Sequence, residues 1–85
     1  MSNPADFLNV VVRKRSGVEF SGAALSFSSI NARGPFDILP KHTNFVCLLR
    51  DRIEINRVEG GWLKMPIGRA VMKVRQNQVD VFLGI

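Results

Sequence analysis

The stretch GPFDILPKHTNFVCLLRDRIEI, residues 34–55, is the most informative part of the chain. A glycine–proline pair begins it, and residues 40–42 form a second turn signal. The apolar run 45–49 has the length and boundaries of a buried strand, although so short a run is also compatible with a helical turn. Residues 52–56 alternate charged or polar side chains with isoleucine, which is typical of a strand with one face in the core. We therefore expect a surface loop followed by two strands.

The rest of the chain repeats this rhythm of short apolar segments and turns. Glu59-Gly60-Gly61 indicates a tight hairpin, because glycine accepts the positive φ angles that such turns require. Ser21-Gly22 and Gly68 indicate places where a strand bends or breaks. The further strands are expected at 7–13, 18–20, 23–27, 62–67, 70–74 and 79–83. The pattern predicts a single all-β domain over residues 1–85, a two-sheet sandwich or flattened barrel of about eight to ten short, mainly antiparallel strands.

Length and composition restrict where such a domain works. The chain has 85 residues, of which 46% are apolar, so a folded domain is expected rather than disorder. No apolar run reaches the roughly 18–20 residues that span a bilayer. The first positive charges follow the N-terminal apolar stretch, which is the wrong order for a secretory signal. We expect a soluble, intracellular protein, or one that a partner holds on the inner face of a membrane.

The reactive side chains are too few to suggest an active site. Cys47 is the only cysteine and His42 the only histidine, so we expect no disulfide, no zinc site, no other metal or cofactor, and no catalytic pair. Within its apolar run, Cys47 is expected to be a small core residue. The net charge is +5, but only residues 13–15 form a basic run. The positive charge therefore predicts either a solvated basic face or a patch directed at a partner.

Four segments carry a resemblance to a known family. They are FSG at 20–22, GPFDILPKHTNFVCLL at 34–49, RIEI at 52–55 and AVMKVRQNQVDVFL at 70–83. In this order and spacing they resemble the N-terminal β-sandwich domain of the epsilon subunit of F-type ATP synthases, whose mitochondrial equivalent is called delta. The chain departs from the usual family pattern at Asp37 and Lys41, where glycines are common. The family's C-terminal helical hairpin is not expected in these 85 residues, so the inhibition of ATP hydrolysis and the ATP binding of that hairpin are not implied.

The resemblance implies a role without catalysis. It implies a central-stalk rotor subunit that bridges the gamma subunit and the polar loops of the membrane rotor ring (c) subunits in proton-coupled ATP synthesis. Such a subunit is peripheral, on the cytoplasmic face of the inner or plasma membrane. The loop 31–44 is the expected contact surface, because it mixes apolar anchors with polar groups. The residues expected in partner contacts are Arg33, Phe36, Asp37, Ile38, Lys41, His42, Asn44 and Trp62.

Some alternatives stay open at this point. His42 either closes the loop through hydrogen bonds or contacts the rotor ring, and Trp62 either covers the core at an edge strand or anchors gamma. A different class of function is a small basic β-barrel that binds nucleic acid or another protein. Single-strand binders stack bases on exposed aromatic residues beside basic ones. The six phenylalanines here lie mostly in apolar patterns, and the chain has no tyrosine.

Overall fold

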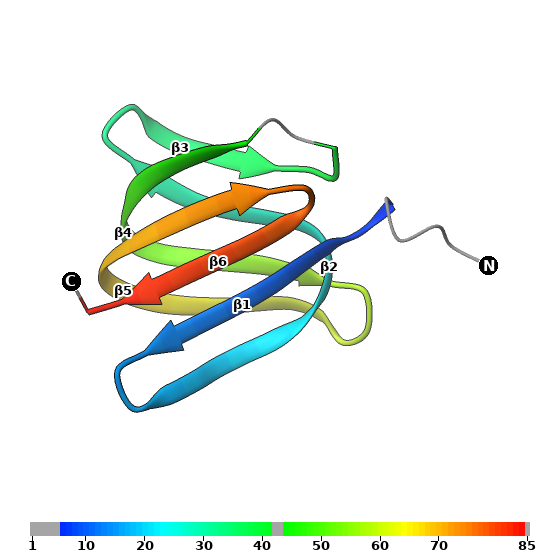
Figure 1. Ribbon diagram of the computed structural model, residues 1–85, viewed down its shortest axis with the longest axis horizontal. Coiled ribbons are helices and arrows are strands. Elements are labelled where there is room, and N and C mark those ends of the chain that lie inside the picture. The colour runs from blue at the N-terminus through cyan, green and yellow to red at the C-terminus, as the bar shows by residue number, and fades with distance from the viewer. Residues whose placement is uncertain (1–5, 42–43, 85) are drawn as a thin grey trace.

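The computed structural model describes residues 6–41 and 44–84, and its strands close into a barrel. The strands are β1 (Leu8–Lys14), β2 (Gly17–Asn31), β3 (Gly34–Ile38), β4 (Phe45–Arg57), β5 (Gly61–Arg75) and β6 (Gln78–Leu83). They form one sheet in the order β1-β6-β5-β4-β2-β3, and the additional β1–β2 pairing closes five of them into a ring with β3 attached to β2 (Figure 1). The β1–β6 pair is parallel and the other pairs are antiparallel. The predicted all-β class is confirmed.

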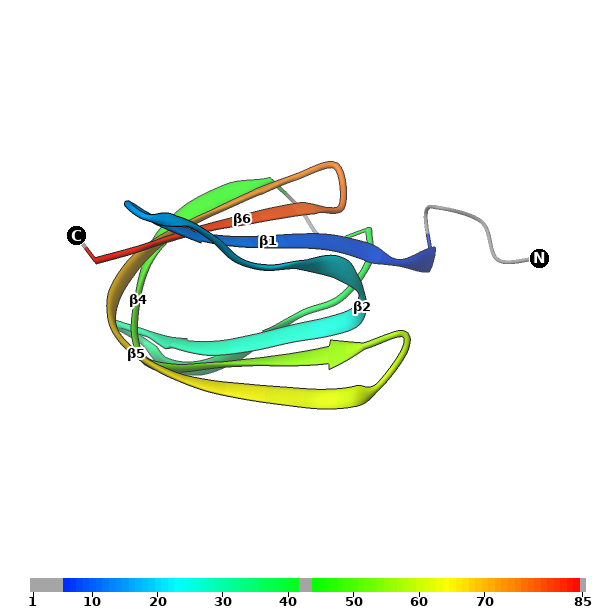
Figure 2. The same ribbon diagram turned by 90° about the horizontal axis from the view of Figure 1, so that it is seen from below.

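The barrel is flattened into two layers, with extents of 38 × 26 × 19 Å (Figure 2). Strands β2, β4 and β5 each curve from one layer into the other. One layer contains β1, β6 and the adjoining halves of the three long strands, and the other contains their remaining halves and β3. Within residues 6–41 and 44–84, no helix is long and apolar enough to cross a membrane.

The long strands correct the expected number of strands. Segments that the sequence separates at Ser21-Gly22, at Asp51 and at Gly68 are continuous, so the described residues form six strands instead of eight to ten. The apparent breaks are bends and bulges within strands. On β4 the register shifts between Arg50 and Arg52, and Asp51 between them has a φ of 70°. Bulges of this kind bend a strand without ending it, which allows one strand to serve both layers.

Alternation along the strands builds the core. The inward side chains of β1 and β6 are leucine and valines, and those of β4 include Ile53 and Ile55. They meet Phe27 of β2, which is fully buried opposite Ile38 and Ile55. These residues belong to a single buried cluster. Interdigitated side chains of this kind make a close-packed interior that resists deformation.

The apolar run 45–49 forms the first part of β4, so the helical alternative is excluded. The prediction of a buried strand is correct for one face only, because Val46 and Leu48 are 64% and 65% exposed. Leu49 is buried, and the half-buried Cys47 packs against the core as expected. A barrel has a single interior, and the outward side chains at this position have no covering element among the described residues. This leaves an exposed apolar face on the outside of the barrel.

Candidate protein-binding surface

The structure separates the residues that the sequence grouped into one contact loop. Arg33 lies in the turn between β2 and β3, whereas Lys41 and Asn44 lie beside the β5–β6 turn at the opposite end of the barrel (Figure 1). There the Lys41 backbone N–H donates to Asn77 Oδ1 at 2.6 Å, and the Gln76 backbone N–H donates to Asn44 Oδ1 at 3.1 Å. The predicted contact at His42 lies outside the described residues. Arg33 is therefore held at one end of the barrel, where its backbone N–H donates to Asn31 Oδ1 at 2.8 Å, and Lys41 and Asn44 are held at the other.

The remaining predicted contacts differ in their exposure. Ile38 is fully buried, so it belongs to the core and not to an exposed surface, because β3 directs alternate side chains inward. Phe36 is half-buried and packs against the same core. Asp37 is exposed between them. Trp62 is 51% exposed on β5, opposite Asn56 of β4.

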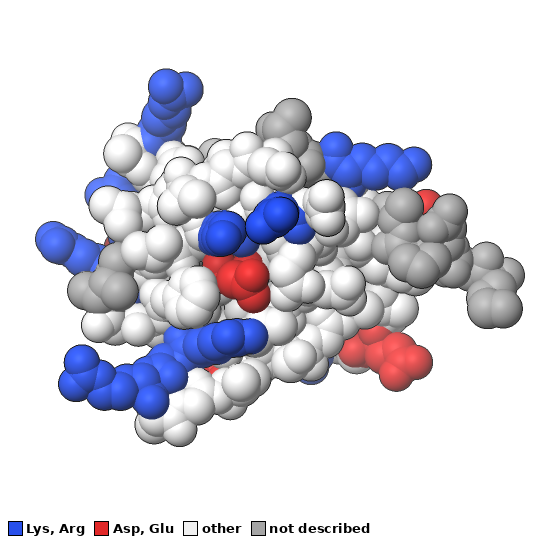
Figure 3. Space-filling model, in the orientation of Figure 1, with Lys and Arg blue, Asp and Glu red and all other residues white. Residues whose placement is uncertain are grey.

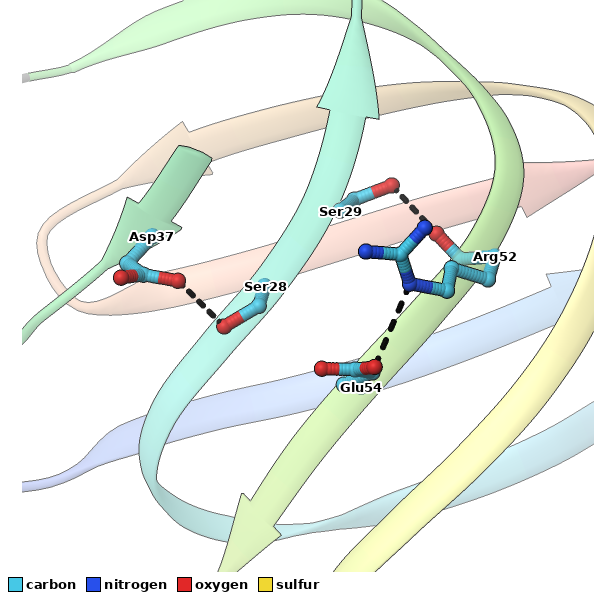
Figure 4. Close-up of polar contacts among 5 residues, drawn as sticks. All are labelled: Ser28, Ser29, Asp37, Arg52 and Glu54. Carbon is cyan, nitrogen blue, oxygen red and sulfur yellow. Dashed lines mark hydrogen bonds and ion pairs between the residues drawn. The ribbon is translucent and has the colours of Figure 1, made fainter. Parts of the chain in front are cut away.

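Asp37 belongs to a polar row on the outside of the layer that contains β3. Cross-strand pairing places Asp37, Ser28, Glu54 and Lys64 next to one another across four strands. The Ser28 hydroxyl donates to Asp37 Oδ1 at 2.6 Å, and Arg52 Nε lies 3.2 Å from Glu54 Oε1 (Figure 4). This face is therefore hydrophilic, and charges of opposite sign lie next to one another on it.

The other layer has an apolar outer face. Leu48, Val71 and Phe82 are successive cross-strand neighbours on β4, β5 and β6, and Val46 precedes Leu48 on the same face. We call Val46, Leu48, Val71 and Phe82 the apolar patch. Phe82 is 40% exposed, and Arg13 Cζ lies 6.0 Å from the centre of its ring. A contiguous exposed apolar area of this kind marks a binding surface. The sequence signal for it was the missing alternation in 45–49.

A basic end adjoins the apolar patch. Several basic side chains project from the end of the barrel that carries the β1–β2 and β2–β3 turns (Figure 3). Arg50 and Arg69 lie opposite each other where β4 and β5 bend. With Leu48 they line an open hollow of about 440 Å³, which we call the arginine hollow. Its other lining residues are Asn31, Ala32 and Leu49.

The charges are unevenly distributed over the molecule. Six of the twelve basic residues belong to the basic end through the β1–β2 turn, the β2–β3 turn and the arginine hollow, and two of the seven acidic residues, Glu19 and Asp51, accompany them. The basic members are Arg13, Lys14, Arg15, Arg33, Arg50 and Arg69. Lys14 Nζ lies 2.7 Å from Glu19 Oε1, so part of this charge is paired. Most of the net charge of +5 is therefore concentrated at one end.

The surface offers binding groups and little reactive chemistry. Among residues 6–41 and 44–84, no group of three His, Cys, Asp or Glu side chains is placed to hold a metal ion. Burial raises the pKa of the Cys47 thiol, and a hydrogen bond with Asn31 partly offsets this effect. A raised pKa keeps the thiol neutral and weakly nucleophilic. The arrangement favours non-covalent recognition through the apolar patch and the basic end.

Known structures share this architecture. The barrel occurs in chains of mitochondrial ATP synthases. A chain in the structure of the Euglena gracilis mitochondrial ATP synthase, OSCP/F1/c-ring in rotational state 1, matches with a TM-score of 0.85 and 14% identity over 96% of this chain. A chain of the Tetrahymena thermophila mitochondrial ATP synthase central stalk/c-ring matches with a TM-score of 0.75 and 13% identity over 92% of this chain.

Each match covers only part of the matched ATP synthase chain. The chain spans 53% of the Euglena chain and 63% of the Tetrahymena chain, so it corresponds to part of each. No family model matches the sequence, and no curated protein sequence matches it. At 13–14% identity the likeness establishes the common fold.

Proposed function

We propose that the chain is a non-catalytic central-stalk (rotor) subunit of an F-type ATP synthase, of the epsilon type that is called delta in mitochondria. The observation that carries this proposal is the TM-score of 0.85 over 96% of the chain with a mitochondrial ATP synthase chain. The epsilon-like segments of the sequence support it separately, because they cover both layers of the barrel. In this proposal residues 1–85 act as one epsilon-type domain.

A closed barrel suits the mechanical part of this role. An adaptor that transmits torque must keep two contact surfaces in a fixed relative position, and it needs no catalytic group. Here β2, β4 and β5 run through both layers, so bending the layers apart would disrupt their hydrogen-bonded ladders and the shared core. The rigid body would connect the gamma subunit to the rotor ring in proton-coupled ATP synthesis, without a cofactor of its own.

The two partners would contact different surfaces. We assign gamma to the apolar patch, because burial of exposed apolar side chains supplies affinity. We assign the rotor-ring (c) loops to the end with Lys41 and Asn44, which are exposed polar residues. Exposed ion pairs contribute only about 0–1 kcal/mol each, so contacts at that end would set orientation more than affinity. The protein would thus be peripheral to the membrane, on the cytoplasmic face of the inner or plasma membrane, through its protein partners.

Co-purification tests this proposal. The tagged chain, expressed with the gamma subunit of the same organism, is expected to form a stable complex that survives gel filtration. The purified chain alone is expected to show no ATP hydrolysis. A chain that migrates separately from gamma over a range of salt concentrations would contradict the proposed function.

The second candidate function is nucleic-acid binding, which the basic end and the Arg13–Phe82 contact favour. Basic side chains beside an exposed aromatic ring are a recurrent arrangement in single-strand binders. A mobility-shift titration at increasing salt distinguishes the candidates. Binding to nucleic acid would weaken steeply with salt, because phosphate contacts release counterions. The stalk proposal expects no such complex.

A further inference from the structure

Arg50 and Arg69 form an uncompensated pair of like charges. They are direct cross-strand partners on β4 and β5, an arrangement in which the two Cβ atoms lie about 4.5–5.5 Å apart and like charges are destabilising. In the part of the chain that the structure describes, the ion pairs join Lys14 with Glu19 and Arg52 with Glu54. Neither guanidinium of the Arg50–Arg69 pair therefore has a carboxylate partner among these residues. An external anion would relieve the repulsion.

Strand pairing fixes the backbone positions of both arginines. Arg50 is held between Ile30 of β2 and Arg69 of β5, immediately before the bulge at Asp51. The Gly84 N–H donates to the Arg69 carbonyl oxygen at 3.1 Å, which ties the end of β6 to the bend of β5. The two side chains consequently leave from ordered, adjacent positions, and less conformational entropy is lost when a ligand orders them.

The arginines also adjoin apolar surface. Leu48 lines the arginine hollow and belongs to the apolar patch, so the two features form one continuous surface. Arg50 and Arg69 form one outward cross-strand pair, and the next outward pair on the same two strands is Leu48 and Val71. The outer surface therefore changes from charged to apolar between neighbouring pairs. A ligand that fits both features must therefore carry a negative charge next to an apolar group.

We propose that the arginine hollow and the apolar patch bind a segment of a protein partner that carries a carboxylate side chain beside an apolar one. The carboxylate bridges the guanidiniums of Arg50 and Arg69, which present planar donors suited to its two oxygens. The neighbouring apolar side chain covers Leu48. This inference rests on the proposed function, because a stalk subunit requires a protein partner on one of its faces.

The composition of the surface favours protein over lipid or nucleic acid. Val46 and Leu48 are more exposed than Phe82, whose ring already lies close to Arg13, so aliphatic contacts outweigh stacking. Lys73 and Asp80 are cross-strand partners in the row next to Leu48, so the charge beside the apolar patch is balanced, whereas an anionic bilayer or a phosphate backbone requires an extended basic surface. The tryptophan, the residue that favours membrane interfaces, is on the outer face of the other layer.

Two substitutions on β5 test the charge component. Arg69→Glu reverses one charge of the pair, and Lys64→Glu makes the same change of net charge on the polar face as a matched control. The probe is the purified gamma subunit of the same organism, titrated by calorimetry. Arg69→Glu is expected to weaken binding roughly tenfold or more, because it places a carboxylate against the incoming one. Lys64→Glu is expected to stay within about twofold of the wild type.

A third variant tests the apolar component. Leu48→Gln keeps the charge and approximate size of the side chain but makes its exposed part polar, and it is expected to weaken binding several-fold. Circular dichroism melts of the free variants confirm that each is folded. Binding of the wild type and of Arg69→Glu is also measured at two salt concentrations, and the wild type is expected to lose more affinity at high salt.

The outcomes separate the inference from the proposed function. A wild type that binds gamma while Arg69→Glu and Leu48→Gln bind equally well overturns the inference and leaves the stalk function standing. A wild type that does not bind gamma overturns the proposed function, and the inference falls with it. A third result also overturns the inference: Arg69→Glu loses binding to anionic vesicles or to single-stranded DNA while its binding to gamma is unchanged. The ligand of the arginine hollow would then be a lipid or a nucleic acid and not a protein.

Discussion

The hydroxyl of Ser29 is expected to stabilise the bend of β4 that closes the barrel. Ser29 is 4% exposed, and its Oγ donates to the Arg52 carbonyl oxygen at 2.7 Å (Figure 4). The hydrogen bond spans the point where the β2–β4 register shifts, beside the bulge at Asp51. Ser29→Ala removes the donor and leaves the carbonyl oxygen without it.

The structure sets the size of this effect. Removing one partner of a hydrogen bond whose donor is buried costs about 1–3 kcal/mol, because the remaining group has already lost part of its water. Small domains are stable by about 5–15 kcal/mol in total, so this is a considerable fraction. For a domain of this length each 1 kcal/mol lowers the midpoint of thermal unfolding by about 4–8 °C. We expect Ser29→Ala to lower this midpoint by about 4–24 °C.

The neighbouring serine supplies the control. Ser28 donates to Asp37 on the outer face, where water can replace the lost bond, so Ser28→Ala is expected to cost no more than about 1 kcal/mol. Urea unfolding followed by circular dichroism gives both free energies, and equal slopes show that the unfolded states are comparable. If the two variants were equally stable, the hydroxyl of Ser29 would have no part in holding the bulge, and the argument would be refuted.

Three further predictions concern residues of β4. Asp51→Val is expected to cost about 1–2 kcal/mol in urea unfolding, because a β-branched residue disfavours the φ of 70°, and an unchanged stability would contradict the bulge. Leu49→Ala is expected to cost about 2–5 kcal/mol, whereas Leu48→Ala on the outer face costs less than about 1 kcal/mol; the reverse order would show that the strand faces the other way. Burial raises the pKa of Cys47, so its alkylation by iodoacetamide at pH 8 is expected to be several-fold slower than in the urea-unfolded chain, and equal rates would contradict its position. The same raised pKa stabilises the fold below the unfolded pKa of the thiol, and this contribution is lost as the pH rises through the folded value.

Local patterns predicted the inward faces of strands and the turns well. The alternation over 52–56 correctly placed Ile53 and Ile55 in the core, because neighbouring side chains of a strand point to opposite faces. The glycine pair at 60–61 does form the β4–β5 turn, with φ angles of 100° and 69°. In both cases the deciding interaction lies within a few residues of chain. Interactions of this local kind are determined by the sequence alone.

The candidate surface was only partly predictable. The sequence placed Ile38 in the contact loop, whereas pairing of β3 with β2 turns it into the core. It also assigned the whole run 45–49 to the interior, since apolar side chains alone do not reveal which face is covered. Arg50 and Arg69 are separated by nineteen positions in the sequence, and no sequence pattern connects them. Only the β4–β5 register brings them together.

Composition and period-two alternation were thus sufficient to establish an all-β domain, most of its core and its turns, because these depend on local backbone preference and on burial of one strand face. The tertiary structure decided that the bulge at Asp51 bends β4 without ending it, which made six long strands from a larger number of short ones. It also decided that Leu48 faces outward beside two arginines. Both outcomes depend on which strands pair and in which register, and these long-range pairings are selected by the packing of the whole barrel.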